Sequence, residues 1–186
     1  MDCIAYEDFS LFFSALKFCA EKHRTQRRKD AARTPYLNHP IEVAEILWRV
    51  GGVREITVLA AALLHDVIED TEAVPEEVSA LFGGEILSLV LEVSDDKSLP
   101  AARRKELQVL HAPALSLGAK LIKIADKICN VRDITRSPPP DWPFERRMGY
   151  LDWAERVVSG LGAFNAELED HFHKHLAEGR KKLEGR

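Results

Sequence analysis

Cysteine is scarce in this chain of 186 residues. Its three cysteines, Cys3, Cys19 and Cys129, are odd in number, widely spaced and form no CxxC motif. This pattern excludes a disulfide framework and a zinc ribbon. Unpaired cysteines are typical of a reducing compartment, so we expect a cytoplasmic protein.

Long apolar runs and an excess of positive charge are both absent. No run of about 18 apolar residues occurs, so we expect no membrane span. Residues 1–18 carry early acidic side chains and no small-residue cleavage site, which predicts that there is no signal peptide. The 26 basic and 30 acidic side chains give a net charge of −4. This acidity argues against nucleic acid as a partner.

The alternation of apolar and polar residues that is typical of strands is also missing. Apolar residues instead recur at intervals of three and four. This spacing predicts helices over 8–23, 40–50, 54–68, 74–82, 85–93, 101–111, 118–134, 144–159 and 163–178. The helix over 54–68 is apolar on every side, as buried helices are. We therefore expect one all-α domain over 1–178, with a frayed tail over 179–186.

The segment HDVIED, at the end of the most apolar predicted helix, concentrates charge. His65 should lie over Glu69 and Asp66 over Asp70, because residues four apart on a helix share a face. Crowded carboxylates repel one another, and burial makes their charge costlier. A divalent cation bound by imidazole nitrogen and carboxylate oxygen relieves both effects. A solvated helix end is the alternative interpretation.

Two more polar residues stand in apolar surroundings. His39 precedes Pro40 at a predicted helix start, and Asp126 lies within KLIKIADKICN. A buried aspartate is costly without a partner, so its alternative explanation is a salt bridge to Lys123 or Lys127. Polar residues on three separate predicted helices favour one shared site.

Positive charge is concentrated in residues 22–33, which contain six Lys or Arg and one Asp. In a chain of net negative charge, such a block indicates a small anionic ligand rather than a polyanion. Arginine binds phosphate oxygens in pairs. The segment ends close to His39, so it can reach the same cleft, and a solvated loop is the alternative.

A histidine-rich segment, HFHKH, occupies residues 171–175. His171 and His175 are four residues apart, which is a workable chelating pair. The segment lies on an amphipathic helix near the terminus, so we interpret it as surface.

Together, these motifs resemble a known family. The pattern of His39, His65-Asp66 and Asp126 resembles the H…HD…D metal set of the HD-domain phosphohydrolases. The segments HRTQRRKDAARTPYLNHPIEVA, AALLHDVIEDT and GAKLIKIADKICNVRDI are similar to the hydrolase domain of RelA/SpoT proteins. The small stand-alone alarmone hydrolases, of the metazoan SpoT homologue type, look most similar.

The resemblance implies an all-α HD-domain helical bundle and a manganese-dependent hydrolase. Its implied substrate is guanosine tetra- or pentaphosphate, cleaved at the 3′ position to release pyrophosphate. The implied Mn²⁺ ligands are His39, His65, Asp66 and Asp126. The carboxylates implied to position or deprotonate the attacking water are Glu69 and Asp70. The residues implied to contact nucleotide are Arg28, Lys29, Asn130, Arg146 and Tyr150.

One residue departs from the pattern of this subgroup. Ala101 stands where the metazoan-type proteins have a lysine after Leu-Pro, and Arg104 is the candidate replacement for that phosphate contact. The chain is too short for a synthetase domain, so we expect it to degrade the alarmone without making it. No obligate protein partner is evident.

Other functions remain open at this point. The same site is suited to removing the 2′-phosphate of NADPH, which also carries phosphate on a ribose oxygen. A general HD nucleotidase acting on 5′-monophosphates and a non-catalytic alarmone-binding module are further alternatives.

Overall fold

The computed structural model describes residues 6–185, and these are largely helical. The helices are α1 (Tyr6–Lys22), α2 (Asn38–Arg49), α3 (Ile56–Leu64), α4 (Val67–Asp70), α5 (Pro75–Phe82), α6 (Gly84–Val93), α7 (Ala101–His111), the 3₁₀ turn η1 (Ala112–Ala114), α8 (Leu117–Arg136), α9 (Phe144–Leu161) and α10 (Ala166–Glu184). Residues 6–185 contain no strand, only an isolated antiparallel bridge between Arg27 and Pro35. The predicted all-α class is confirmed.

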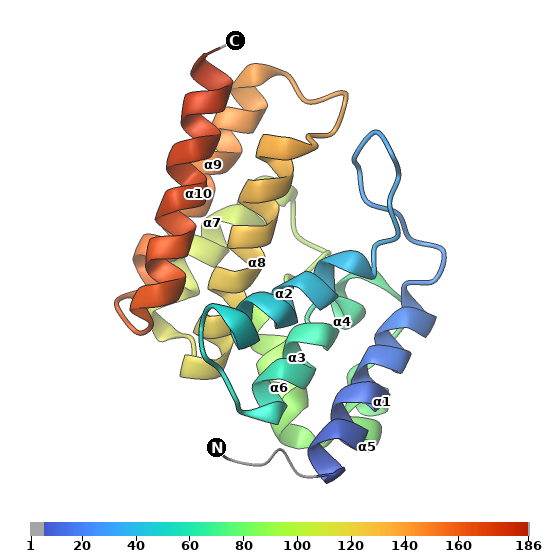
Figure 1. The fold of residues 1–186 in the computed structure, drawn as a ribbon. Coiled ribbons are helices and arrows are strands. Elements are labelled where there is room, and N and C mark those ends of the chain that lie inside the picture. Colours follow the sequence, from blue (N-terminus) through green and yellow to red (C-terminus); the bar gives the residue numbers. More distant parts are fainter. Residues whose placement is uncertain (1–5, 186) are drawn as a thin grey trace.

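Helix α8 is the central element of the bundle (Figure 1), where it contacts α2, α3, α6, α9 and α10. The side chain of Ser116 caps its first turn by accepting a hydrogen bond from the backbone N–H of Ala119. Buried residues follow on most of its circumference, including Ile122, Ala125 and Ile128. A polar side chain on the buried face of α8 therefore points into the core or into a cavity within it.

Helix α3 is buried along most of its length, as its uniformly apolar sequence predicts. The predicted end at Ile68 is wrong, because α3 ends at Leu64. The backbone leaves helical geometry at Asp66, where φ is −105° and ψ is −3°, and the short helix α4 follows. His65 Nδ1 lies 2.8 Å from the carbonyl oxygen of Ala62 and satisfies one of the free carbonyls at this helix end.

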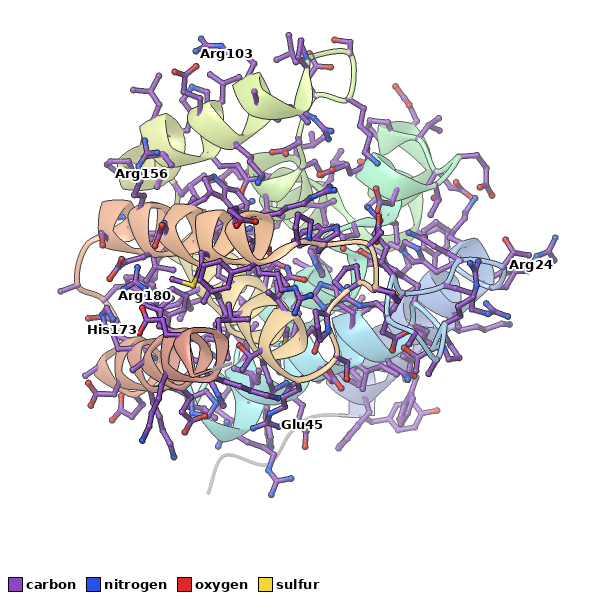
Figure 2. All side chains as sticks on the ribbon, turned by 90° about the horizontal axis from the view of Figure 1, so that it is seen from above. Arg24, Glu45, Arg103, Arg156, His173 and Arg180 are labelled. Carbon is purple, nitrogen blue, oxygen red and sulfur yellow. The ribbon has the colours of Figure 1, made fainter. Side chains whose placement is uncertain are left out.

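The expected frayed tail is corrected over residues 179–184, which continue α10. Leu183 is buried, and it extends the apolar stripe of Leu168, Phe172 and Leu176. Gly179 lets α10 pass close to α8, because an added Cβ would lie 2.6 Å from Thr135 Oγ1. Arg180 lies between α9 and α10 (Figure 2) and pairs with Asp152 and Glu155 of α9.

The cysteines in the described part of the chain, Cys19 and Cys129, are both free and buried. Cys3 lies outside the described residues. No helix within residues 6–185 combines the length and apolar character that crossing a membrane requires.

Candidate metal centre and active site

Three buried ligand groups converge from separate parts of the chain. His39 lies on α2, His65 follows α3, and Asp126 lies on α8. His39 Nε2 is 3.1 Å, and His65 Nε2 is 3.8 Å, from the same Asp126 oxygen, Oδ1. One ligand atom from each of the three residues falls within 4.8 Å of the others. The two histidines are at most 4% exposed, so this cluster lies inside the bundle.

Asp66 lies against the same cluster. Its Oδ2 is 3.0 Å from His65 Nε2 and 3.8 Å from His39 Nε2. The Tyr36 hydroxyl donates a short hydrogen bond to this oxygen. The structure therefore brings together all four residues that the sequence suggests as metal ligands.

The nitrogen atoms of His65 suit a cation. Since a carbonyl only accepts, His65 must donate Nδ1–H to Ala62, which leaves a lone pair on Nε2 in the neutral ring. That Nε2 is buried and lies 3.0 Å from Asp66 Oδ2, but the two atoms lack the geometry of a hydrogen bond. An imidazole oriented through its other nitrogen is the usual form of a metal-ligating histidine. Imidazole and carboxylate donors together fit a divalent transition-metal ion.

The electrostatics of the cluster also favour a cation. Burial alone disfavours charge on His65, but the Asp66 carboxylate outweighs it and raises the pKa of His65 to about 9. Burial lowers the pKa of His39. Burial also opposes ionisation of Asp66, yet the His65 charge holds its pKa below the usual range. The aspartate thus remains an anion whose positive partner is the protonated His65, and a bound divalent cation would take over that role.

Asp126 has protein partners as well. Lys127 Nζ lies 2.9 Å from Asp126 Oδ2, and Asn130 donates to Oδ1 at 2.6 Å. The salt bridge to Lys127, our alternative explanation for this aspartate, is therefore present beside the histidine cluster. Lys123 instead donates to the carbonyl of Val93 at 2.8 Å. These contacts hold the Oδ1 edge of Asp126 toward the histidines.

Glu69 and Asp70 are placed by the break between α3 and α4. The His65 ring is directed toward Asp66 and Asp126, and Glu69 lines the same cavity as His65. Glu69 accepts a hydrogen bond from the backbone of Asp95 at 2.9 Å. Burial raises the pKa of Glu69 to about 7. A carboxylate of this pKa is suited to taking a proton near neutral pH.

Two cavities adjoin at this cluster. The smaller, of about 180 Å³, contains the metal-ligand candidates and Glu69. The larger, of about 440 Å³, contains Arg27, Arg28 and Lys29. Residues that line both are Tyr36, His39, Asp70 and Asn130. The lining of the larger cavity also includes the carboxylates of Asp30, Glu42, Asp70 and Asp133. The metal-ligand candidates are therefore next to a cavity that has charges of both signs and room for a nucleotide.

Four of the five residues suggested to contact nucleotide line the larger cavity: Arg28, Lys29, Asn130 and Tyr150. Arg28 is held by Asp133 Oδ2 at 2.5 Å and by Asn130 Oδ1 at 3.2 Å. Arg146 is not among the lining residues, because its guanidinium lies over the Trp142 ring at 4.3 Å from the centroid. Trp142 itself does line the cavity.

The basic side chains of α7 face in different directions, some toward solvent and one toward the site. Arg103 points away from the molecule (Figure 2). Arg104 turns inward, where its Nη1 lies 3.5 Å from Glu69 Oε1. Ala101 is exposed at the start of the helix. Arg104 is therefore positioned beside Glu69, at the edge of the proposed metal centre.

Residues 15–148 match the family model described as HD domain. The chain belongs to the HD-domain family. Human guanosine-3′,5′-bis(diphosphate) 3′-pyrophosphohydrolase MESH1 (Homo sapiens) is 51% identical to it over 166 residues, 89% of this chain and 92% of the human protein. The MESH1 protein of Drosophila melanogaster, which has the same description, is 50% identical over 158 residues, 85% and 88% of the two chains.

A solved structure agrees with these similarities. The structure of a metazoan ortholog of SpoT that hydrolyzes ppGpp matches this HD-domain protein with a TM-score of 0.89 and 47% identity. The match covers 91% of this chain and 95% of that one. The resemblance to the small stand-alone type is thereby confirmed.

Several residues of this HD-domain site were not anticipated from the sequence. They are Gln26, Tyr36, Lys97 and Trp142, which contact a proposed metal ligand, Asp70 or the larger cavity. Helical spacing gave no signal for Tyr36, because it lies in the turn before α2, where its carbonyl accepts a hydrogen bond from the His39 backbone N–H at 2.9 Å. Lys97 and Trp142 lie in polar or proline-rich connections, where periodicity carries no information.

Proposed function

We propose that the chain hydrolyses guanosine-3′,5′-bis(diphosphate) at its 3′ position, yielding GDP and pyrophosphate. The observation that carries this proposal is the histidine–aspartate cluster, which adjoins a cavity of about 440 Å³ that Arg27, Arg28 and Lys29 help to line. The relatives named for this reaction support it, because they match nearly the whole chain at about 50% identity. The pentaphosphate form would yield GTP by the same step.

Mn²⁺ is the metal that we propose, held by His39, His65, Asp66 and Asp126. Two imidazoles and two carboxylates leave positions of an octahedral ion free for water and a phosphate oxygen. When bound, a divalent cation supplies Lewis-acid chemistry, lowering the pKa of water and neutralising phosphate charge.

In the proposed reaction, Glu69 acts as the general base. It takes a proton from the attacking water, whose oxygen bonds to the phosphorus attached to the ribose 3′ oxygen. The bond between that phosphorus and the 3′ oxygen breaks, the 3′ oxygen takes up a proton, and pyrophosphate leaves. Asp70, the next residue in the chain, lines both cavities, and from there it would orient the attacking water. General base catalysis of this kind typically contributes ~10²–10⁴-fold.

The cations around the cavities would bind the phosphates. Arg28 and Lys29 line the larger cavity, where paired donors of arginine suit phosphate oxygens. Lys97 pairs with Asp70, and Arg104 lies beside Glu69, so both are placed to meet the phosphate under attack. We propose that Asn130 and Tyr150 contact the nucleoside and that Arg146, stacked on Trp142, acts at the rim.

Product analysis tests this function. Metal-stripped protein would be supplied with Mn²⁺ and given guanosine tetraphosphate or NADPH in separate reactions, with Asp126→Ala as the inactive control. Release of GDP with pyrophosphate is expected. If only NADPH is cleaved, with release of orthophosphate, the proposed metal site stands but the substrate is NADPH. If metal-loaded protein forms no product from either nucleotide, a binding module is favoured.

We further propose that the protein acts in the cytoplasm and needs no nucleic acid, membrane or obligate protein partner. The net charge of −4 and the free, buried Cys19 and Cys129 support this. Full turnover by the purified chain alone would agree with it, whereas activity that requires an added partner would contradict it.

A further inference from the structure

His23 is a buried histidine outside the metal cluster. It follows α1, is 2% exposed, and lies among residues that the reaction described above does not use. Its Nδ1 is 2.5 Å from Gln26 Oε1. Gln26 Nε2 in turn donates to Asp70 Oδ2 at 3.2 Å. A continuous chain of hydrogen bonds thus joins His23 to a carboxylate of the active site.

The direction of every hydrogen bond in this chain is determined. Asp70 is paired with Lys97, so it is an ionised carboxylate and can only accept. The amide nitrogen of Gln26 must therefore face Asp70, which leaves its oxygen facing His23. An amide oxygen also only accepts, so the imidazole must carry its proton on Nδ1.

The same imidazole supports a second path into the site. Its ring stacks on Tyr36, with centroids 4.8 Å apart and planes inclined by 29°. The Tyr36 hydroxyl donates to Asp66. One buried ring therefore contacts the supports of two carboxylates, one proposed to hold metal and one proposed to orient water.

Burying this histidine has a cost that the local fold does not explain. Its Nε2 is buried and has no hydrogen-bond partner, which is unfavourable for a polar atom. The turn after α1 is held without the ring, by backbone hydrogen bonds from His23 to Cys19 and from Gln26 to His23, both 3.0 Å. An apolar side chain would fill the space without leaving an unsatisfied nitrogen.

Asp70 also needs an anchor other than Lys97. The lysine side chain is 49% exposed and lies on the loop between α6 and α7, so its hold on the carboxylate is weak in water. Gln26 donates to Asp70 Oδ2, whereas Lys97 pairs with Oδ1. The hydrogen bond from His23 to Gln26 Oε1 restrains rotation of the Gln26 amide. A misplacement of about 1 Å in an active site can cost ~10²-fold in rate.

We propose that His23 is a positioning residue, which orients Asp70 through Gln26 and supports Tyr36 against Asp66. This inference rests on the proposed function, since it assigns His23 a part in that reaction. His23 contacts neither substrate nor metal, and it acts only through its neighbours.

Two substitutions separate the hydrogen bond from simple filling of space. His23→Phe keeps a stacked ring but cannot donate, so we expect kcat to fall ~10–100-fold, with KM changed by less than about twofold. His23→Asn places an amide N–H where Nδ1–H stands, and we expect it to recover most of that loss. Melting temperature and bound Mn²⁺ are measured on each variant.

A double-substitution cycle tests the path through Gln26. Gln26→Leu should reproduce the loss in kcat, and His23→Phe should then cost less than about twofold more, because residues acting in one chain are not additive. Equal kcat for wild type and His23→Phe would overturn the proposal. So would a His23→Asn variant no faster than His23→Phe, or fully additive losses.

One measurement is independent of activity. Nitrogen-15 NMR of labelled histidine should show His23 with its proton on Nδ1, and a ring protonated only at Nε2 would overturn the proposal. If wild type fails to hydrolyse the alarmone while the Nδ1 proton is present, the proposed function fails and the hydrogen-bond chain stands.

Discussion

Two histidine clusters in this molecule look alike in the sequence and differ in space. His171 and His175 lie on α10 with their Nε2 atoms 3.2 Å apart. His39 and His65 come from different elements and share Asp126. The first pair has spacing along one helix, whereas the second cluster has buried carboxylates that converge on it.

The charge around each cluster explains the difference. Burial, then nearby Lys174 and Arg132, lowers the pKa of His171. A cation bound there would meet two positive side chains, and the one carboxylate of residues 6–185 within ion-pair distance of His175 is the half-exposed Glu178, at 3.4 Å. Around His65, Asp66 and Asp126 supply the opposite charge. Chelating spacing alone is therefore a weak sign of a metal site, and convergent anionic ligands are a stronger one.

The largest expected difference between the two clusters is the loss of turnover when a proposed metal ligand is removed. Asp126→Ala should lower Mn²⁺-dependent turnover by more than the ~10–100-fold typical of residues that only orient a ligand. The control, His171→Ala with His175→Ala, should keep turnover within about twofold. Metal content and product release are measured on both. Equal losses in the two variants would contradict the assignment of the metal to the buried cluster.

Glu69→Gln should slow the reaction without emptying the buried cluster. We expect a loss of ~10²–10⁴-fold in kcat with bound Mn²⁺ unchanged. Burial raises the pKa of Glu69 to about 7, and a bound cation lowers it, so wild-type activity should fall as pH drops below 7. The base must be deprotonated, so protonation removes activity. A pH–rate profile in which the variant keeps this acidic limb would exclude Glu69 as the base.

Lys123 lines the smaller cavity, and Lys123→Met tests how much its buried charge lowers the free energy of unfolding. Burial lowers the pKa of Lys123 to about 8, so the folded state disfavours its charge. The unfolded state binds the proton more tightly, and stability should rise with pH between about 8 and 10.5. Below pH 8, we expect the variant to gain up to about 3 kcal/mol over wild type. Denaturant unfolding should show this gain shrinking toward pH 10.5, and a constant difference would contradict it.

Gly179→Ala should affect α10 and not the chemistry. The added Cβ would meet Thr135 Oγ1 at 2.6 Å, so we expect a loss of about 1–3 kcal/mol. Gly149→Ala in α9 is the matched control, since nothing lies within 4 Å of its Cβ. Thermal unfolding should separate the two, while kcat per folded molecule stays at the wild-type value. A stable Gly179→Ala protein would show that α10 does not need this close approach.

Much of the fold was predictable because each helix has its own signals. The apolar spacing and the glycine pairs at 51–52 and 83–84 are local. The break at Asp66 was not predictable, since HDVIED is compatible with a continuous helix. The full length of α10 was not predicted, because Leu183 and Gly179 stabilise it only through packing against α8 and α9, which the local sequence does not reveal.

The sequence by itself determined the helical class, the chemical character of the metal ligands and the family that their order indicates. Residue type and spacing decide these, because they depend on chemistry within a few turns of chain. Only the tertiary structure decided that His65 faces Asp126, that Arg104 reaches Glu69, and that His23 is joined to Asp70. Those contacts join residues distant in the chain, and their geometry is set by how the helices pack.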